Sequence, residues 1–278
     1  MTPSDIHDTH PGPRPAVRLH AETTGSGARL VLAHGFTQTG RLWGPMAEDL
    51  ARDHQVVSVD LPGHGGSSDV RADLPTGARL LVDVGGSGTY LGYSMGARFC
   101  LHAALSFPGR VRSLILISGT AGIEDDGLRH DRVIADEALA SELDPPLEGE
   151  RDHDDRERID AFLHRWLDRP LFAGIPEGEV GLAQRRANTA AGLASSLRLA
   201  GTGTQRPLWD QLPLLEMPVL VISGVGDTKF TVLGERMAST IGENAVHAVV
   251  PGVGHTAHLE DPDRVTELVR AHLPAPSD

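Results

Sequence analysis

The chain has one cysteine, no basic N-terminal segment and no long apolar run. The single Cys100 excludes an internal disulfide, which suits a reducing compartment. The N-terminus has no basic region followed by an apolar stretch, as a secretory signal requires. No apolar run approaches the roughly 18 residues of a membrane span. We therefore expect a cytoplasmic protein that does not bind membranes.

Positive charge is also scarce. The 25 Lys and Arg residues are outnumbered by 38 Asp and Glu, which gives a formal net charge of -13. Nucleic acids and anionic membranes are bound through surfaces rich in Lys and Arg, so neither is expected as a partner. An anionic small molecule would have to meet a local cluster of arginines.

Short apolar runs alternate with helical patterns along most of the 278 residues. This alternation predicts an α/β fold with a mostly parallel sheet and helices on both faces. The expected strands are 30–33, 56–59, 90–93, 114–117, 219–222 and 246–250. The expected helices are 42–51, 79–84, 95–107, 233–241 and 264–272.

The alternation stops between residues 122 and 207, where charged amphipathic stretches such as 152–166 replace the apolar runs. We expect an inserted helical cap at 122–207 and one core formed by 17–121 and 208–278. Residues 1–16 are rich in Pro, His, Asp and Thr without periodicity, which indicates a flexible leader.

The most informative motif is the G-x-S-x-G run from Gly92 to Gly96, between an expected strand and an expected helix. A serine on a sharp, strained turn of this kind needs neighbours without side chains two positions before and after it, because the backbones nearly touch there. Gly92 and Gly96 meet this requirement, so Ser94 is the candidate reactive residue. The alternative is a chance turn in a chain with 32 glycines.

A serine hydroxyl is reactive at neutral pH only when a histidine takes its proton and an acid orients that histidine. Asp227 follows one expected strand and His255 follows the next. Catalytic groups in open α/β sheets collect at the carboxyl ends of the strands, so Ser94, Asp227 and His255 should converge.

Three nearby residues offer other interpretations. His258 is an alternative base, but His255 directly follows a glycine-rich turn that aims it inward. His64 is expected to shape a loop near the pocket, and Asp60 to be a structural acid at a strand end.

Charge that develops on a substrate oxygen needs two backbone N–H donors. Met95 supplies one by its position at the start of a helix. Phe36, in the loop after strand 30–33, is the candidate for the second, with core packing as its alternative role.

Arg98 lies one helical turn after Ser94, so the two side chains should be neighbours. A guanidinium at this place suits bidentate capture of a carboxylate. The alternative is an arginine that simply extends to solvent. The first interpretation predicts a small carboxylic acid as substrate.

Six segments together resemble the menaquinone-pathway 2-succinyl-6-hydroxy-2,4-cyclohexadiene-1-carboxylate synthase family, over a span from about Arg29 to Leu273. The segments are His34-Gly35-Phe36, Asp60-Leu61-Pro62-Gly63-His64-Gly65, Gly92-Tyr93-Ser94-Met95-Gly96-Ala97-Arg98, Arg169-Pro170-Leu171-Phe172-Ala173, Gly226-Asp227-Thr228-Lys229-Phe230 and Gly254-His255-Thr256-Ala257-His258-Leu259-Glu260.

The resemblance implies an α/β-hydrolase fold and an enzyme that removes pyruvate from a cyclohexene polycarboxylate by 2,5-elimination, with no metal or organic cofactor. It implies that Arg98, Arg132 and Arg186 bind substrate carboxylates. Tyr93 and Trp166 match pocket aromatics of the family.

The leading hypothesis is a carbon–oxygen lyase in which His255 activates Ser94 to abstract a ring proton, while the N–H groups of Met95 and Phe36 stabilise the developing charge. The alternative is a serine hydrolase that forms an acyl-enzyme on Ser94 and cleaves an ester, lactone or carbon–carbon bond of a small acid. A ligand-binding module without turnover is a third class, against which the complete set of Ser, Asp and His argues.

Overall fold

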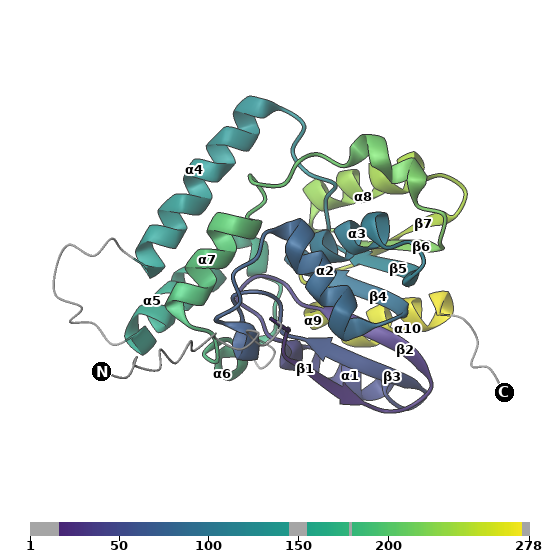
Figure 1. Ribbon diagram of the computed structural model, residues 1–278, viewed down its shortest axis with the longest axis horizontal. Coiled ribbons are helices and arrows are strands. Elements are labelled where there is room, and N and C mark those ends of the chain that lie inside the picture. Colours follow the sequence, from purple (N-terminus) through teal and green to yellow (C-terminus); the bar gives the residue numbers. More distant parts are fainter. Residues whose placement is uncertain (1–16, 145–154, 178–179, 274–278) are drawn as a thin grey trace, which may run out of the picture.

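One mostly parallel sheet organises the residues that the computed structural model describes, which are 17–144, 155–177 and 180–273 (Figure 1). Within these residues seven strands lie in the order β1-β3-β2-β4-β5-β6-β7, with β1 antiparallel to β3 and every other pair parallel. The strands are β1 (Ala21–Thr24), β2 (Ala28–Ala33), β3 (His54–Val59), β4 (Gly88–Tyr93), β5 (Val111–Ile117), β6 (Val219–Gly224) and β7 (Ala245–Val250).

Alternate side chains of the central strands enter two separate cores, because successive residues of a strand point to opposite faces. On one face Leu114 and Val221 pack with helices α2, α3 and α8, and on the other Ile115 and Ile222 pack with α1 and α10. The helices are α1 (Gly44–Leu50), α2 (Leu74–Gly85), α3 (Met95–Ser106), α8 (Thr228–Ile241), α9 (Ala257–Glu260) and α10 (Pro262–His272). Short 3-10 helices are η1 (Gly40–Trp43), η2 (Gly65–Ser67), η3 (Pro170–Phe172) and η5 (Trp209–Leu214).

The fold class expected from the sequence is confirmed, and each of the expected strands is present. Each is two or three residues longer at one end than expected, except 246–250, which gains one residue. Strand β1 was not expected. This strand has four residues, which are mostly polar and exposed, so it carries no apolar alternation. No helix of the described part of the chain is long and apolar enough to cross a membrane. The leader expected at 1–16 lies outside the described residues.

The cap consists of helices α4 (Asp126–Leu143), α5 (Asp155–Leu167), α6 (Leu182–Arg185) and α7 (Ala190–Ala200), all within the expected insertion 122–207. Figure 1 shows α4, α5 and α7 together at one end of the sheet. They share a core of their own, which includes Leu143, Phe162, Leu193 and Leu197. The cap is therefore a packed unit.

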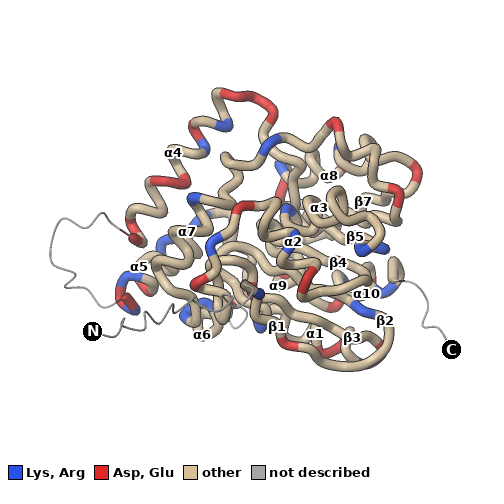
Figure 2. The backbone as a smooth tube through the Cα atoms, in the orientation of Figure 1, with Lys and Arg blue, Asp and Glu red and all other residues tan. Residues whose placement is uncertain are grey.

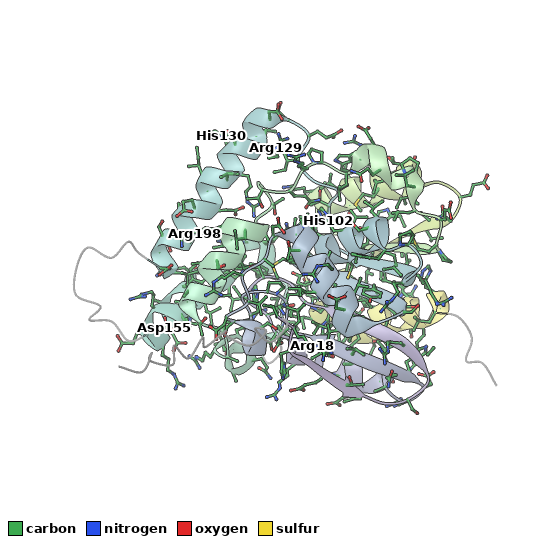
Figure 3. The ribbon with its side chains drawn as sticks, in the orientation of Figure 1. Arg18, His102, Arg129, His130, Asp155 and Arg198 are labelled. Carbon is green, nitrogen blue, oxygen red and sulfur yellow. The ribbon has the colours of Figure 1, made fainter. Side chains whose placement is uncertain are left out.

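Polar contacts also determine the ends and the packing of the cap helices. The Asp125 carboxylate accepts the Leu128 N–H at 2.8 Å and caps α4, whose surface carries both acidic and basic residues (Figure 2). Arg198 of α7, labelled in Figure 3, donates to Glu137 at 3.0 Å and to Asp144 at 3.2 Å, both near the end of α4. These ion pairs join α7 to α4.

We predict that the core of the cap contributes strongly to stability. Leu193 is fully buried, whereas Leu199 on the same helix is 38% exposed. Leu193→Ala should lower the free energy of unfolding by about 2–5 kcal/mol, because it removes buried methyl groups and leaves a cavity. Leu199→Ala should change it by less than about 0.5 kcal/mol. Urea unfolding followed by circular dichroism measures both, and equal effects would contradict the packing.

Candidate active site

Ser94 occupies a strained turn between β4 and α3. Its φ of 50° and ψ of -104° place it in a region that a non-glycine residue rarely adopts. A methyl group on Gly92 would overlap the backbone of Gly96, and one on Gly96 would overlap the carbonyl oxygen of Ala33. The G-x-S-x-G spacing is thus required by the close approach of these backbones, and it presents the serine hydroxyl at the edge of the sheet.

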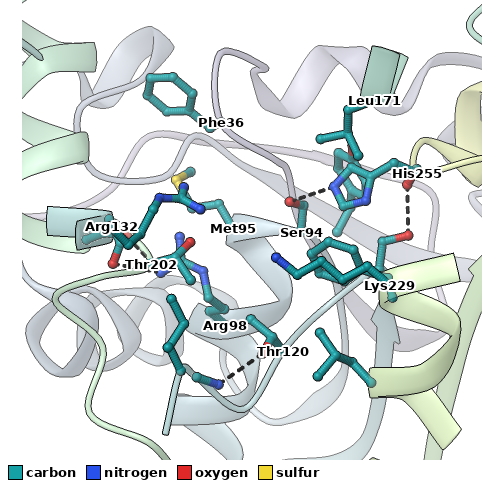
Figure 4. Close-up of a pocket in the computed structure, with 18 of the residues that line it drawn as sticks. Phe36, Ser94, Met95, Arg98, Thr120, Arg132, Leu171, Thr202, Lys229 and His255 are labelled. Carbon is teal, nitrogen blue, oxygen red and sulfur yellow. Dashed lines mark hydrogen bonds between the residues drawn. The ribbon is translucent and has the colours of Figure 1, made fainter. Parts of the chain in front are cut away.

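Ser94, His255 and Asp227 form one chain of hydrogen bonds. Figure 4 shows the bond between Ser94 and His255. His255 Nδ1 donates to Asp227 Oδ2 at 2.6 Å, and Ser94 Oγ donates to His255 Nε2 at 3.2 Å. Asp227 and His255 are buried. The carboxylate therefore selects the imidazole tautomer whose free nitrogen faces the serine, which is the arrangement needed to move a proton from Oγ.

The loop that carries His255 is held on both sides. The Ser118 hydroxyl donates to the His255 carbonyl at 2.8 Å. The Glu260 carboxylate accepts from Gly254 N–H at 2.7 Å, from Thr256 N–H at 3.0 Å and from the Thr256 hydroxyl at 2.6 Å. Neither Glu260 nor Ser118 could be assigned a role from the sequence, because their function depends on contacts that no spacing rule reveals.

His258, the alternative base, and Asp60, the expected structural acid, both have structural environments. The ring of His258 lies 4.2 Å from that of Tyr93 and 5.0 Å from that of Trp43, between centroids, and burial lowers its pKa to about 3. Asp60 accepts the N–H groups of Gly40 at 2.7 Å and Gly66 at 2.8 Å, so it is a loop-holding acid.

Two buried histidines shape the loop that carries Phe36. His34 Nδ1 donates to the Gly35 carbonyl at 2.8 Å, and its Nε2 accepts the Leu61 N–H at 3.0 Å. His64 Nε2 accepts the Thr37 N–H at 3.3 Å. Burial lowers the pKa of His34 to about 4 and that of His64 to about 3. Both rings are therefore neutral supports for this loop.

Phe36 and Met95 line the same cavity as Ser94. Met95 is the first residue of α3, so its N–H has no acceptor within the helix and lies at the positive end of the helix dipole. Phe36 follows β2, and its ring packs edge-on against Trp166 at 5.1 Å between centroids. Their two backbone N–H groups are the candidates for holding a developing oxyanion.

The cavity has a volume of about 800 Å³ and opens between the sheet edge and the cap. Figure 4 shows Arg98 and Arg132 on one side of Ser94, with His255 and Lys229 on the other. Tyr93 and Trp166 contribute aromatic walls. The Tyr93 ring lies 5.5 Å from that of His255, and burial raises the pKa of its hydroxyl.

Arg98 is only 6% exposed and lines this cavity. Its Nη1 donates to the carbonyls of Ala200 at 2.8 Å and Gly201 at 3.3 Å, at the C-terminal end of α7. Burial, with the nearby charge of Arg132, lowers its pKa to about 10, so it stays cationic at neutral pH. Arg132 also lines the cavity and pairs with Asp136 at 2.8 Å.

The expectation for Arg186 has to be corrected. Its side chain is exposed, pairs with Asp160 at 2.7 Å and faces a different hollow. The adjacent Arg185 is 1% exposed and lines the main cavity instead. Consecutive residues of a helical turn point about 100° apart, so only one of the two arginines can face inward.

Arg185 is held tightly, although no carboxylate among the described residues pairs with its charge. It donates to the Thr37 hydroxyl at 2.6 Å and to the Val180 carbonyl at 2.8 Å. Its Nη2 is buried and has no hydrogen-bond partner in the described residues. Burial lowers its pKa to about 10. A buried donor without a partner, on a residue that lines the same cavity as Ser94, is suited to an acceptor oxygen of a ligand. Among the described residues no group of three or more His, Cys, Asp or Glu could hold a metal ion.

The model of the alpha/beta hydrolase family matches residues 30–268, and the chain belongs to this family. It is 29% identical over 258 residues to the putative 2-succinyl-6-hydroxy-2,4-cyclohexadiene-1-carboxylate synthase of Bacillus subtilis (strain 168), with 88% of this chain and 89% of that protein covered. It is also 29% identical over 244 residues to the synthase of Enterobacter sp. (strain 638), with coverages of 85% and 88%.

Solved structures of two other proteins also resemble this chain. MenH from S. aureus superposes with a TM-score of 0.81 at 28% identity, covering 91% of this chain and 97% of that one. A thermophilic esterase from Thermogutta terrifontis, with malate bound, has a TM-score of 0.73 at 25% identity, with coverages of 91% and 92%. The resemblance expected from the sequence is confirmed.

We predict that the buried histidines make the protein less stable in mild acid. Below pH 6.5 the unfolded chain takes up protons that folded His34, His64 and His258 bind only near pH 3–4. Stability therefore falls as the pH falls through this window, by about 2 kcal/mol per histidine at pH 5. His258→Phe keeps an aromatic ring against Tyr93 and should reduce the loss between pH 7.5 and pH 5 by that amount in urea unfolding. An unchanged loss would contradict the assignment.

We predict that Glu260 positions the His255 loop. Glu260→Gln replaces one acceptor oxygen by an NH₂ group, so the three hydrogen bonds cannot all persist. The kcat of the reaction that depends on Ser94 should fall about tenfold, with little change in KM because Glu260 does not line the cavity. Glu267→Gln, on the exposed face of α10, is the matched control and should leave both constants unchanged. A change in KM alone would argue against a positioning role.

Proposed function

We propose that the chain is a 2-succinyl-6-hydroxy-2,4-cyclohexadiene-1-carboxylate synthase, a lyase of menaquinone biosynthesis that eliminates pyruvate from a cyclohexene polycarboxylate. One observation carries the proposal: a hydrolase-type Ser, His and Asp set shares its cavity with arginines from three different elements. The similarity to synthases over most of both chains supports the same reaction.

The proton transfers follow from the hydrogen-bonded chain. His255 Nε2, 3.2 Å from Ser94 Oγ, takes the hydroxyl proton while Asp227 stabilises the imidazolium that forms. Ser94 Oγ then removes a ring proton of the substrate. The C–H electron pair forms a new ring double bond, and the existing double bond shifts. The bond between the ring carbon and the oxygen of the three-carbon enolpyruvyl group then breaks. The oxygen keeps that electron pair, and pyruvate leaves after protonation.

The arginines explain how an acidic protein binds a polyanion. The chain has a formal charge of -13, so a substrate with several carboxylates needs concentrated positive charge at its site. Arg98 on α3, Arg132 on α4 and Arg185 on α6 supply it. Their positions on separate elements can hold carboxylates at several points, which orients the ring over Ser94.

The backbone donors complete the proposed site. In the elimination, negative charge spreads from the ring carbon into the adjoining acyl or carboxylate group. Met95 and Phe36 line the cavity together with Ser94, and their backbone N–H groups are suited to stabilise that charge.

Acyl transfer is the second candidate function. The strained turn at Ser94 is the feature that favours it, since serine hydrolases use such a turn to present their nucleophile. The similarity to the Thermogutta terrifontis esterase supports the same chemistry. An acyl adduct on Ser94, detected by intact-protein mass spectrometry after mixing with a small activated ester, together with failure to release pyruvate, would establish this alternative.

The proposed function is tested by pyruvate release from the enolpyruvyl-bearing cyclohexene precursor. The wild-type protein should release pyruvate in a lactate dehydrogenase-coupled assay, and Ser94→Ala should lower the rate by at least about a thousandfold, because the proton-abstracting oxygen is gone. Absence of release by the wild-type protein would refute the synthase assignment.

The two adjacent arginines provide a matched pair of variants. Arg185→Met should lower kcat/KM for pyruvate release by about 10- to 100-fold, because a buried cation that faces the substrate is lost. Arg186→Met removes the same charge one residue away, outside the cavity, and should change kcat/KM by less than about twofold. Equal losses in the two variants would contradict the position of the carboxylate-binding surface.

A further inference from the structure

Lys229 is the only lysine of the chain. It is the second residue of α8, two positions after Asp227, and its side chain is exposed at the cavity that contains Ser94. Within the described residues its ammonium group pairs with no carboxylate, and its contact is the ring of Phe230, 5.7 Å from the ring centroid. The side chain extends from α8 across the cavity, on the His255 side (Figure 4).

The other cations that line the cavity divide into two groups. Arg132 pairs with Asp136 at 2.8 Å, and Arg236 pairs with Glu124 at 2.5 and 2.9 Å. Arg98 and Arg185 have no carboxylate partner among the described residues. Lys229 is therefore the third cation of this cavity that pairs with no carboxylate of the described chain.

The substrate of the proposed reaction carries three carboxylates. Two belong to the product, on its ring and on its succinyl group, and the third belongs to the pyruvate that leaves. Arg98 and Arg185 are 6% and 1% exposed, deep in the cavity, whereas Lys229 is exposed at its mouth. Deep cations suit the part of the substrate that must stay fixed during proton abstraction. A flexible cation at the mouth suits the group that departs.

We propose that Lys229 binds the carboxylate of the enolpyruvyl group and remains beside it as pyruvate is eliminated. This role depends on the proposed synthase function. When the C–O bond breaks, its electron pair passes to the departing oxygen, and the enolate takes the proton that His255 has received through Ser94. The Lys229 ammonium keeps its own protons. It holds the carboxylate and offsets the enolate charge.

Three variants test the assignment. Lys229→Met keeps the apolar stem but removes the charge, and kcat/KM for pyruvate release should fall about 10- to 100-fold. Lys229→Arg keeps a cation at the same place and should recover most of that loss. Arg110→Met removes one exposed positive charge just before β5, outside the cavity lining, and should change kcat/KM by less than about twofold.

Binding measurements separate the two ends of the substrate. The two probes are pyruvate and 2-succinylbenzoate, which is an aromatic analogue of the product and carries its ring and succinyl carboxylates. Each probe is titrated separately into the wild-type protein and each variant, and binding is followed by NMR. Lys229→Met should weaken pyruvate binding at least about fivefold and leave binding of 2-succinylbenzoate within about twofold. An equal or larger loss for 2-succinylbenzoate, unchanged pyruvate binding, or no pyruvate binding by the wild-type protein would overturn the proposal.

The two assays distinguish the failure of this proposal from failure of the proposed function. If the wild-type protein releases no pyruvate from the precursor, the synthase function is wrong and this role of Lys229 falls with it, whatever the ligands do. If the wild-type protein releases pyruvate and Lys229→Met does so with unchanged kcat/KM, the synthase function stands and the role of Lys229 is refuted.

Discussion

The close approach of three backbone segments beneath Ser94 is the constraint on which the site depends. Side chains at Gly92 or Gly96 would collide with the facing backbone, including the carbonyl of Ala33 on the neighbouring strand. This contact joins β2, β4 and α3, and it forces Ser94 into a conformation with φ of 50°. The strain places the hydroxyl, the start of α3 and the loop after β2 around one point.

Everything that acts on Ser94 comes from the same edge of the sheet. Asp227 and His255 follow β6 and β7, so parallel pairing of these strands brings the acid and the base together. Ser118, after β5, holds the His255 carbonyl at 2.8 Å. The cap closes this edge from the other side, and the bonds from Arg98 to the end of α7 connect the helix that begins beside Ser94 to the cap.

Positive charge is concentrated in the cavity at an energetic cost. Burial lowers the pKa values of Arg98 and Arg185, yet both remain far above neutral pH and carry their charge. Arg185 even has a buried Nη2 with no partner in the described residues. A folded chain tolerates such an arrangement when a ligand supplies the missing acceptors, which is why we interpret the cavity as built for a polyanion.

The fold and the proposed catalytic set could be predicted from the sequence because both depend on local rules. Apolar runs mark the central strands, and the spacing around Ser94 follows from steric contact. Strand β1 could not be predicted, because its polar residues carry no pattern. The choice between Arg185 and Arg186 depends on the orientation of the four-residue helix α6, which short-range sequence does not determine. The contacts of Glu260 likewise exist only in the folded loop.

In the proposed mechanism Ser94 acts as a base in an elimination instead of forming an acyl-enzyme. The sharpest test of this role is the isotope effect on pyruvate release in a single turnover, with a precursor deuterated at the ring position that loses its proton. If Ser94 removes that proton, pyruvate release should be slower from the deuterated precursor than from the unlabelled one. Equal rates, with a covalent adduct of the substrate on Ser94 in the intact protein, would contradict it.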